Sequence, residues 1–234
     1  MFGLGGYYGI DSLYLLLVLP AILFSMWAQS KVQGTFSRYQ KVRSDSGYTG
    51  AEVARRILDD NGLSNVRVEH IQGSLTDHYD PRAQVVRLSD SVYGSNSIAA
   101  LGVAAHETGH AVQHATGYGP LNLRNAIIPM TQFGSQLSMP LILIGFLLNF
   151  ESLIGIGILC FATVTLFQLI TLPVEFDASA RAMRTLDGEH ILRDDEVPQA
   201  RKVLTAAALT YVAALIVSAA QLLRFVLLMN RRRR

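Results

Sequence analysis

The sequence contains the pattern His106-Glu107-Thr108-Gly109-His110, whose residue types and spacing suit a zinc hydrolase. On a helix, a spacing of four residues places both imidazoles on one face, where two ring nitrogens can bind one zinc ion. Glu107 lies beside them and can act as the general base for a metal-bound water. A chance match would leave two histidines and a solvated glutamate on a helix surface. Three of the six histidines lie within nine residues, however, which favours a metal site.

A catalytic zinc site needs a third protein ligand and an open position for water or substrate. His114 continues the spacing of four but lies eight residues after His106, about 12 Å along an unbroken helix, which is too far for both to bind one metal. The long metzincin pattern also requires glycine and histidine where this chain has Gln113 and Thr116. The sequence therefore indicates a second-layer or surface role for His114.

Glu175 is the better third ligand, because this carboxylate follows 23 uncharged residues and closing a zinc site would explain its position. An ordinary acid at the membrane interface is the alternative. We predict a site with one zinc ion per chain and no other cofactor. Glu107 is its catalytic residue, and its metal ligands are His106, His110 and Glu175.

The segment around this motif shows signals for a small mixed domain. Thr49-Gly50-Ala51-Glu52 reads as a capping box that opens a helix, and Asn61-Gly62 ends it. Val66–His70 and Gln84–Leu88 alternate polar and apolar residues, which predicts two or three strands. The run Ile98–Ala115 predicts the helix that carries the zinc motif.

Four long uncharged runs, in a chain that is 50% hydrophobic and only 16% charged, indicate a membrane protein. Each run can cross a hydrocarbon core that needs roughly 20 apolar residues. The expected transmembrane helices are residues 12–30, 125–150, 152–174 and 203–230, the last built on the uncharged run 203–223. Residues 1–11 have no lysine or arginine, so the first run predicts an uncleaved anchor rather than a signal peptide. The prolines at 20, 129 and 140 predict kinks.

The second and third runs form a tight hairpin, because Glu151 is the only charged residue between them. Residues 31–124, the catalytic portion with the zinc motif, and residues 175–202, a second catalytic segment, must then lie on one membrane face. They carry ten and five of the 20 basic residues, which places both in the cytoplasm. The tail Arg231–Arg234 contradicts this rule, and Arg224 indicates an irregularity in the last run.

The stretches HETGHAVQH and, about sixty residues later, PVEFDASARA resemble the YugP-like neutral zinc metallopeptidases of bacterial membranes over nearly the whole chain. More distantly, the chain is similar to membrane-embedded gluzincins such as the CAAX prenyl endopeptidase and heat-shock protease families, whose second motif is ExxxD. The resemblance implies zinc-activated hydrolysis of peptide bonds. It implies zinc binding by His106, His110 and Glu175, and activation of water by Glu107.

One feature of those families meets a different sequence here, and a second is carried over by position. Their aspartate four residues after the glutamate supports a ligand histidine, whereas this chain has Ser179 at that position and Asp177 two residues after Glu175. They also use an edge strand ahead of the zinc helix to align the substrate backbone, which the resemblance places at Gln84–Ser89.

Together these observations predict an α-helical membrane protein with a small α+β, zincin-like catalytic portion and about four transmembrane helices. The predicted function is a zinc metalloendopeptidase of the bacterial plasma membrane, with its active site facing the cytoplasm and peptides or membrane proteins as substrates. A zinc-binding scaffold or chaperone-like protein without proteolysis is the alternative. A channel or transporter is disfavoured, because the uncharged runs lack intramembrane acids.

The remaining composition narrows the function classes further. A net charge of +2 gives no basic field for nucleic acid, and the single cysteine, Cys160, allows no intramolecular disulfide. No oligomeric state follows from the sequence. His190, Arg181 and Tyr118 are candidates for the oxyanion stabiliser, while His70 and His78 are expected at the surface.

Overall fold

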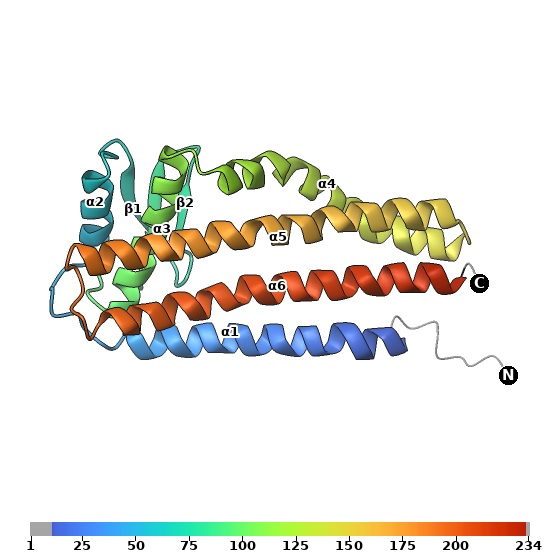
Figure 1. Ribbon diagram of the computed structural model, residues 1–234, viewed down its shortest axis with the longest axis horizontal. Helices are drawn as coiled ribbons and strands as arrows, with labels where there is room; N and C mark the ends of the chain where they lie inside the picture. Colours follow the sequence, from blue (N-terminus) through green and yellow to red (C-terminus); the bar gives the residue numbers. More distant parts are fainter. Residues whose placement is uncertain (1–10, 233–234) are drawn as a thin grey trace. The chain divides into compact units, whose positions relative to one another are not determined.

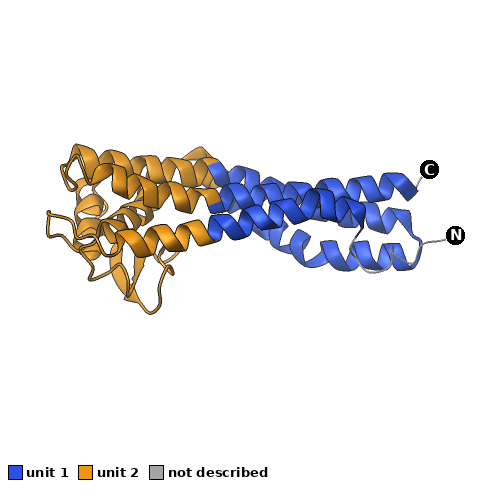
Figure 2. Cartoon of the chain, turned by 90° about the horizontal axis from the view of Figure 1, so that it is seen from below, with its two compact units in different colours: residues 1–29, 123–172, 210–234 blue, residues 30–122, 173–209 orange. Residues whose placement is uncertain are grey.

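The computed structural model describes residues 11–232, so the predictions made from residues 1–10 and from Arg233 and Arg234 lie outside it. Its elements in chain order are η2 (Tyr14–Val18), a π-helical turn, then α1 (Leu19–Tyr39), α2 (Gly50–Asp60), β1 (Arg67–Ile71), β2 (His78–Asp80), β3 (Val85–Ser89), α3 (Ile98–Ala115), α4 (Gly119–Leu147), α5 (Glu151–Gly188) and α6 (Val197–Arg232) (Figure 1). The chain divides into two compact units, coloured in Figure 2. Unit 1 comprises residues 1–29, 123–172 and 210–234, and unit 2 comprises residues 30–122 and 173–209.

Helix α2 begins at the predicted capping box. The Thr49 hydroxyl accepts a hydrogen bond from the Glu52 amide at 3.3 Å, and the Glu52 carboxylate accepts one from the Thr49 amide at 2.8 Å. These two bonds satisfy donors that the first turn of a helix leaves without partners. The helix ends at Asp60, and its C-cap Asn61 is followed by Gly62 with a φ of +70°, where glycine avoids the strain of the left-handed region. The prediction for this helix is confirmed.

The sheet has three strands in the order β1-β3-β2, with β1 parallel and β2 antiparallel to β3. The strand at Gln84–Ser89 is therefore central and its backbone is paired on both sides, so the expectation that it is an edge strand is wrong. Four of the five residues of β3 are buried, and only Arg87 is partly exposed. A strand with apolar side chains on both faces is most stable in the middle of a sheet. The edges of the sheet are β1 and the short β2.

Helix α3 is the centre of unit 2 and spans the predicted residues Ile98–Ala115. The Ser97 side chain caps it by accepting a hydrogen bond from the Ala100 amide at 3.2 Å. One buried cluster joins α3 to α2, the sheet and the end of α1, and a second joins it to α2 and to the parts of α5 and α6 in unit 2. Its many alanines and glycines allow neighbouring helices to approach closely. This packing holds the zinc motif between elements that are far apart in the sequence.

Unit 1 is helical, and its outer surface suits lipid. Among residues 11–232, four helices are long and apolar enough to cross a membrane: Tyr14–Tyr39, Gly119–Leu147, Glu151–Gly188 and Val197–Arg232. Large apolar side chains such as Phe133 (68% exposed) and Leu147 (79% exposed) cover this unit. Exposed apolar surface on this scale is costly in water and stable in a bilayer. The chain is a helical membrane protein with a small α+β portion, as the sequence predicts.

The helices continue beyond the uncharged runs. Helix α5 passes through Glu175 without a break, and α6 begins at Val197, before its run begins at Val203. A change from apolar to polar side chains alters the preferred solvent but leaves the backbone hydrogen bonds of a helix intact. Helix α6 also continues past Arg224 without a break. The Arg224 guanidinium donates to the Asp11 carboxylate at 2.8 Å, and this ion pair explains how α6 carries a charge there.

Candidate metal centre

The site begins where α3 crosses and contacts α5 in unit 2 (Figure 1). Gly109 lies between the two motif histidines, and a Cβ atom on it would be only 2.8 Å from the carbonyl oxygen of Ala178 on α5. The side chain of any larger residue would collide with the backbone of Ala178, which cannot move aside as easily as a side chain can. Glycine at this position therefore permits the close helix contact that brings Glu175 to the histidines.

The side chains of His106, His110 and Glu175 converge in this contact. Each offers one ligand atom, and these atoms all lie within 4.8 Å of one another. The Glu175 Oε2 atom is 3.4 Å from His106 Nε2 and 3.5 Å from His110 Nε2, and the Glu175 residue is only 3% exposed. In a tetrahedral zinc site with bonds of about 2.0–2.2 Å, neighbouring ligand atoms lie about 3.3–3.6 Å apart. The two measured separations and the two-nitrogen, one-oxygen donor set thus fit a zinc ion.

The other ring nitrogen of each histidine is held by a polar side chain. Ser179 Oγ lies 3.1 Å from His106 Nδ1, and Gln113 Oε1 lies 3.0 Å from His110 Nδ1. Histidines that bind a metal usually donate their second N–H to an outer partner, which sets the tautomer and the ring orientation. With Nδ1 engaged in both rings, the Nε2 atoms are the ones left to face Glu175. Ser179, four residues after Glu175 on α5, thus contacts His106 directly.

Asp177 reaches the site through Gln113 rather than directly. Gln113 Nε2 donates to Asp177 Oδ2 at 2.9 Å and to the Val174 carbonyl at 2.8 Å, and Arg181 Nε donates to Asp177 Oδ2 at 2.6 Å. In the sequence, Gln113 stands out only as a mismatch to the metzincin pattern. A signal was present, because Gln113 follows His110 by three residues and so lies near it on the same helix face.

Charge at the site favours the protonated form of one histidine. Burial alone lowers the pKa of His110, but the hydrogen bond to the Glu175 carboxylate and the nearby charge of Glu107 outweigh it and raise the pKa above its ordinary value. The same negative charge attracts a metal cation. Glu107 itself is partly buried on α3, next to His106 in the chain.

The other candidate residues lie away from the three convergent ligand atoms. His114 Nδ1 lies 2.9 Å from the hydroxyl of Tyr79 on β2, and His114 is not part of the cluster. His190 follows the end of α5, about 20 Å along the helix axis from Glu175. His70 and His78 are exposed, as expected, and contact Asp90 and the Thr76 carbonyl.

The two remaining oxyanion candidates take part in other contacts. Arg181 pairs with Asp177, on the Nδ1 side of His110, and its guanidinium lies 5.8 Å from the centre of the Tyr118 ring. The Tyr118 hydroxyl donates to the Pro173 carbonyl at 3.5 Å. The contacts of Arg181 and Tyr118 are therefore with residues near Gln113 and Asp177, and not with the Nε2 atoms of the two histidines.

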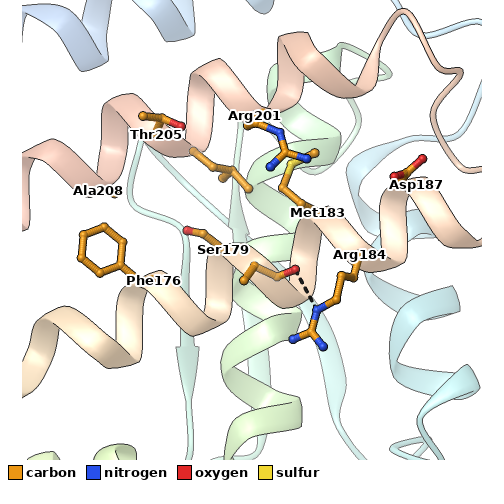
Figure 3. Close-up of a pocket in the computed structure, with 10 residues that line it drawn as sticks. Phe176, Ser179, Met183, Arg184, Asp187, Arg201, Thr205 and Ala208 are labelled. Atoms are coloured by element: carbon orange, nitrogen blue, oxygen red, sulfur yellow. Dashed lines mark hydrogen bonds between the residues drawn. The ribbon is translucent and has the colours of Figure 1, made fainter.

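A cavity of about 350 Å³ opens between α5 and α6 in unit 2 (Figure 3). Phe176 lies at one end and Asp187 at the other, and Arg201 extends from α6 toward Met183. Ser179 lines this cavity and also contacts His106, so the cavity wall includes one support of the metal site.

Comparisons with known proteins agree with this geometry. Residues 14–230 match a family described as "Putative neutral zinc metallopeptidase". The chain is 53% identical over 216 residues to the "Putative membrane protease YugP" of Bacillus subtilis (strain 168), an alignment that covers 92% of this chain and 96% of that protein. No solved structure matches the chain.

Proposed function

Because the chain belongs to the family of neutral zinc metallopeptidases, we propose that it is a membrane-embedded zinc endopeptidase that hydrolyses peptide bonds. The observation that carries the proposal is the spacing of Glu175 Oε2, 3.4 Å and 3.5 Å from the two histidine Nε2 atoms. Three ligands suit a catalytic site with an open position, whereas structural zinc sites are usually closed by four. Among residues 11–232 the described cluster comprises three residues.

Each residue of the site has a defined role in this proposal. His106 and His110 bind zinc through Nε2, and Glu175 binds it through its carboxylate. When bound, zinc supplies a Lewis acid that polarises the substrate carbonyl and lowers the pKa of water to about 7. Glu107 accepts the proton of the attacking water and delivers it to the leaving amine, so that the acyl–nitrogen bond breaks without releasing a free amide anion.

The proposed substrate class is peptides or membrane-protein segments, and the proposed location is the bacterial plasma membrane with the site on the cytoplasmic side. The relative named as a membrane protease supports this substrate class. The cytoplasmic location of the site is supported by the basic residues of 31–124 and 175–202, because basic residues are enriched on the cytoplasmic side of membrane proteins. Unit 2, which holds the site, consists almost entirely of these two segments.

The proposal is tested with Glu107→Gln in the detergent-purified protein. The amide keeps the size of the side chain but does not accept the proton, so we expect zinc content to stay at one per chain. Turnover of a fluorescently labelled unfolded protein should fall by about 10²–10⁴-fold. Glu52→Gln, an exposed glutamate of the α2 cap, is the matched control and should retain turnover.

Unchanged turnover in Glu107→Gln would remove Glu107 as the base. A wild-type protein that holds zinc but cleaves no peptide or membrane-protein substrate would favour the scaffold function instead.

A further inference from the structure

Gln113 is a fully buried amide at the contact between α3 and α5. Its exposed fraction is 0%, and its side chain forms three hydrogen bonds that join His110 to α5. Glutamine is mostly found at protein surfaces, and burying an amide is costly unless its donors and acceptor are all satisfied. An apolar side chain of similar size would fill the same volume without this requirement. The bonds of Gln113 therefore call for an explanation beyond packing.

The two partners on α5 determine which way the amide points. The Val174 carbonyl and the Asp177 carboxylate are both acceptors, so the atom that faces them at 2.8 Å and 2.9 Å must be the donating NH₂ group. The amide oxygen is then the atom at 3.0 Å from His110 Nδ1. Because that oxygen only accepts, Nδ1 must carry the proton. The neutral ring consequently has its lone pair on Nε2, the atom that faces Glu175.

The same side chain also locates the third ligand. The Val174 carbonyl that accepts from Gln113 belongs to the residue immediately before Glu175. One amide thus contacts a histidine of α3 and the turn of α5 that carries the carboxylate. Arg181 holds Asp177 from the other side at 2.6 Å, which keeps the acceptor in place.

We infer that Gln113 is a positioning residue of the metal centre: it selects the Nδ1–H tautomer of His110 and sets the distance between His110 and Glu175. This inference deepens the proposed function and rests on its metal site, not on peptide cleavage. Asp177 acts through Gln113 by fixing the orientation of the amide. Neither side chain contacts the reacting atoms.

The test compares Gln113→Leu with Thr108→Val in the full-length, detergent-purified protein. Thr108 is a suitable control, because it is also 0% exposed on α3 but its hydroxyl bonds only to the Ala105 carbonyl of its own helix. Zinc affinity is measured by competition with a chelator of known affinity. Loss of an outer partner typically weakens metal binding 10–100-fold, so we expect about this loss in Gln113→Leu and none in Thr108→Val. The visible spectrum of the cobalt(II)-loaded protein should shift only in Gln113→Leu.

A second pair of variants separates positioning from packing. Gln113→Glu turns a carboxylate oxygen toward two acceptors, Val174 and Asp177, and should weaken zinc binding. Adding Asp177→Asn supplies an amide that can donate to the new carboxylate, so the double variant should recover part of the affinity lost in Gln113→Glu. A role in packing alone predicts no such recovery.

Wild-type zinc affinity and an unchanged cobalt spectrum in Gln113→Leu would overturn the inference. If that variant does not fold, the double variant decides, and failure to recover affinity relative to Gln113→Glu also overturns it. Absence of proteolysis in the wild type would contradict the proposed function while leaving these affinity measurements valid.

Discussion

Replacing Gly109 by alanine should separate the two helices that carry the proposed metal ligands. In an exposed helix, this change would favour folding by up to about 1 kcal/mol, because glycine is a poor helix former. Here the new Cβ atom would lie 2.8 Å from the Ala178 carbonyl oxygen and 3.3 Å from the Ala178 Cα. We therefore expect Gly109→Ala to reduce both stability and zinc affinity.

The size of the effect follows from the contact distances. Favourable non-bonded contacts between heavy atoms lie near 3.5 Å, so α3 and α5 must move apart locally by about 0.5–0.7 Å. Metal–ligand distances tolerate only about 0.2 Å, so Glu175 and the histidines would no longer fit one ion well. Overpacking of this kind costs about 1–3 kcal/mol, which exceeds the gain in helix propensity.

The assay is thermal unfolding with and without zinc, together with zinc competition against a chelator. Gly102→Ala is the matched control on the same helix, because its Cβ would lie 3.8 Å from the Ala200 Cβ and 4.0 Å from the Ala200 carbonyl oxygen, both ordinary contact distances. It should raise the unfolding temperature and leave zinc affinity unchanged. If Gly109→Ala behaves like Gly102→Ala in both measurements, the close contact does not set the geometry of the site and the reasoning fails.

Three further perturbations test other parts of the structure. Thr49→Ala removes an N-cap and should cost about 1 kcal/mol in denaturant unfolding. Hydrogen bonds from the Thr49 amide and hydroxyl lower the pKa of Glu52, so the stability that the Glu52 carboxylate contributes is complete at neutral pH and should be lost as the pH falls below about 4. The variant keeps the backbone amide and lacks the hydroxyl, so its loss over the same pH range should be smaller but not absent. Gly157→Leu should lower the unfolding temperature, because a Cβ atom at that position would lie 2.9 Å from a backbone nitrogen of α4. Gly155→Leu is the control and should not lower it, because a Cβ atom at Gly155 would meet no atom of another helix within 4 Å. Equal unfolding temperatures for the two variants would argue against tight packing of α4 on α5. Chelation of zinc should lower the unfolding temperature, because zinc at 100 times its Kd stabilises the folded protein by about 2.7 kcal/mol. If a chelator lowers the unfolding temperature of Glu175→Ala by the same amount, Glu175 is not the third ligand.

Local features of the fold could be predicted from the sequence, because they depend on interactions between residues that are close in the chain. The cap of α2 depends on two side chains three residues apart, and the extent of α3 follows from the run Ile98–Ala115. The four membrane helices follow from length and composition in the same way. Helix α5 is longer than its uncharged run, since it continues through Glu175 where the hydropathy changes.

The position of a strand within the sheet was not readable. Alternation in Gln84–Leu88 predicts a strand, but the neighbours of that strand depend on where β1 and β2 fold back. The structure places β3 in the centre, and this leaves the short β2 as the edge whose Tyr79 contacts His114. Order in a sheet is a property of the whole domain, which explains why the family-based expectation failed.

The spacing of the motif alone determines that His106 and His110 share one helix face, and hydropathy determines that Glu175 follows a long uncharged run. Only the tertiary structure decides that this carboxylate comes within 3.5 Å of both rings, because the approach depends on a glycine facing a backbone carbonyl of another helix. It also decides which partners hold the second ring nitrogens. Ser179 and Gln113 are unremarkable in the sequence, and they gain their roles when α3 and α5 pack together.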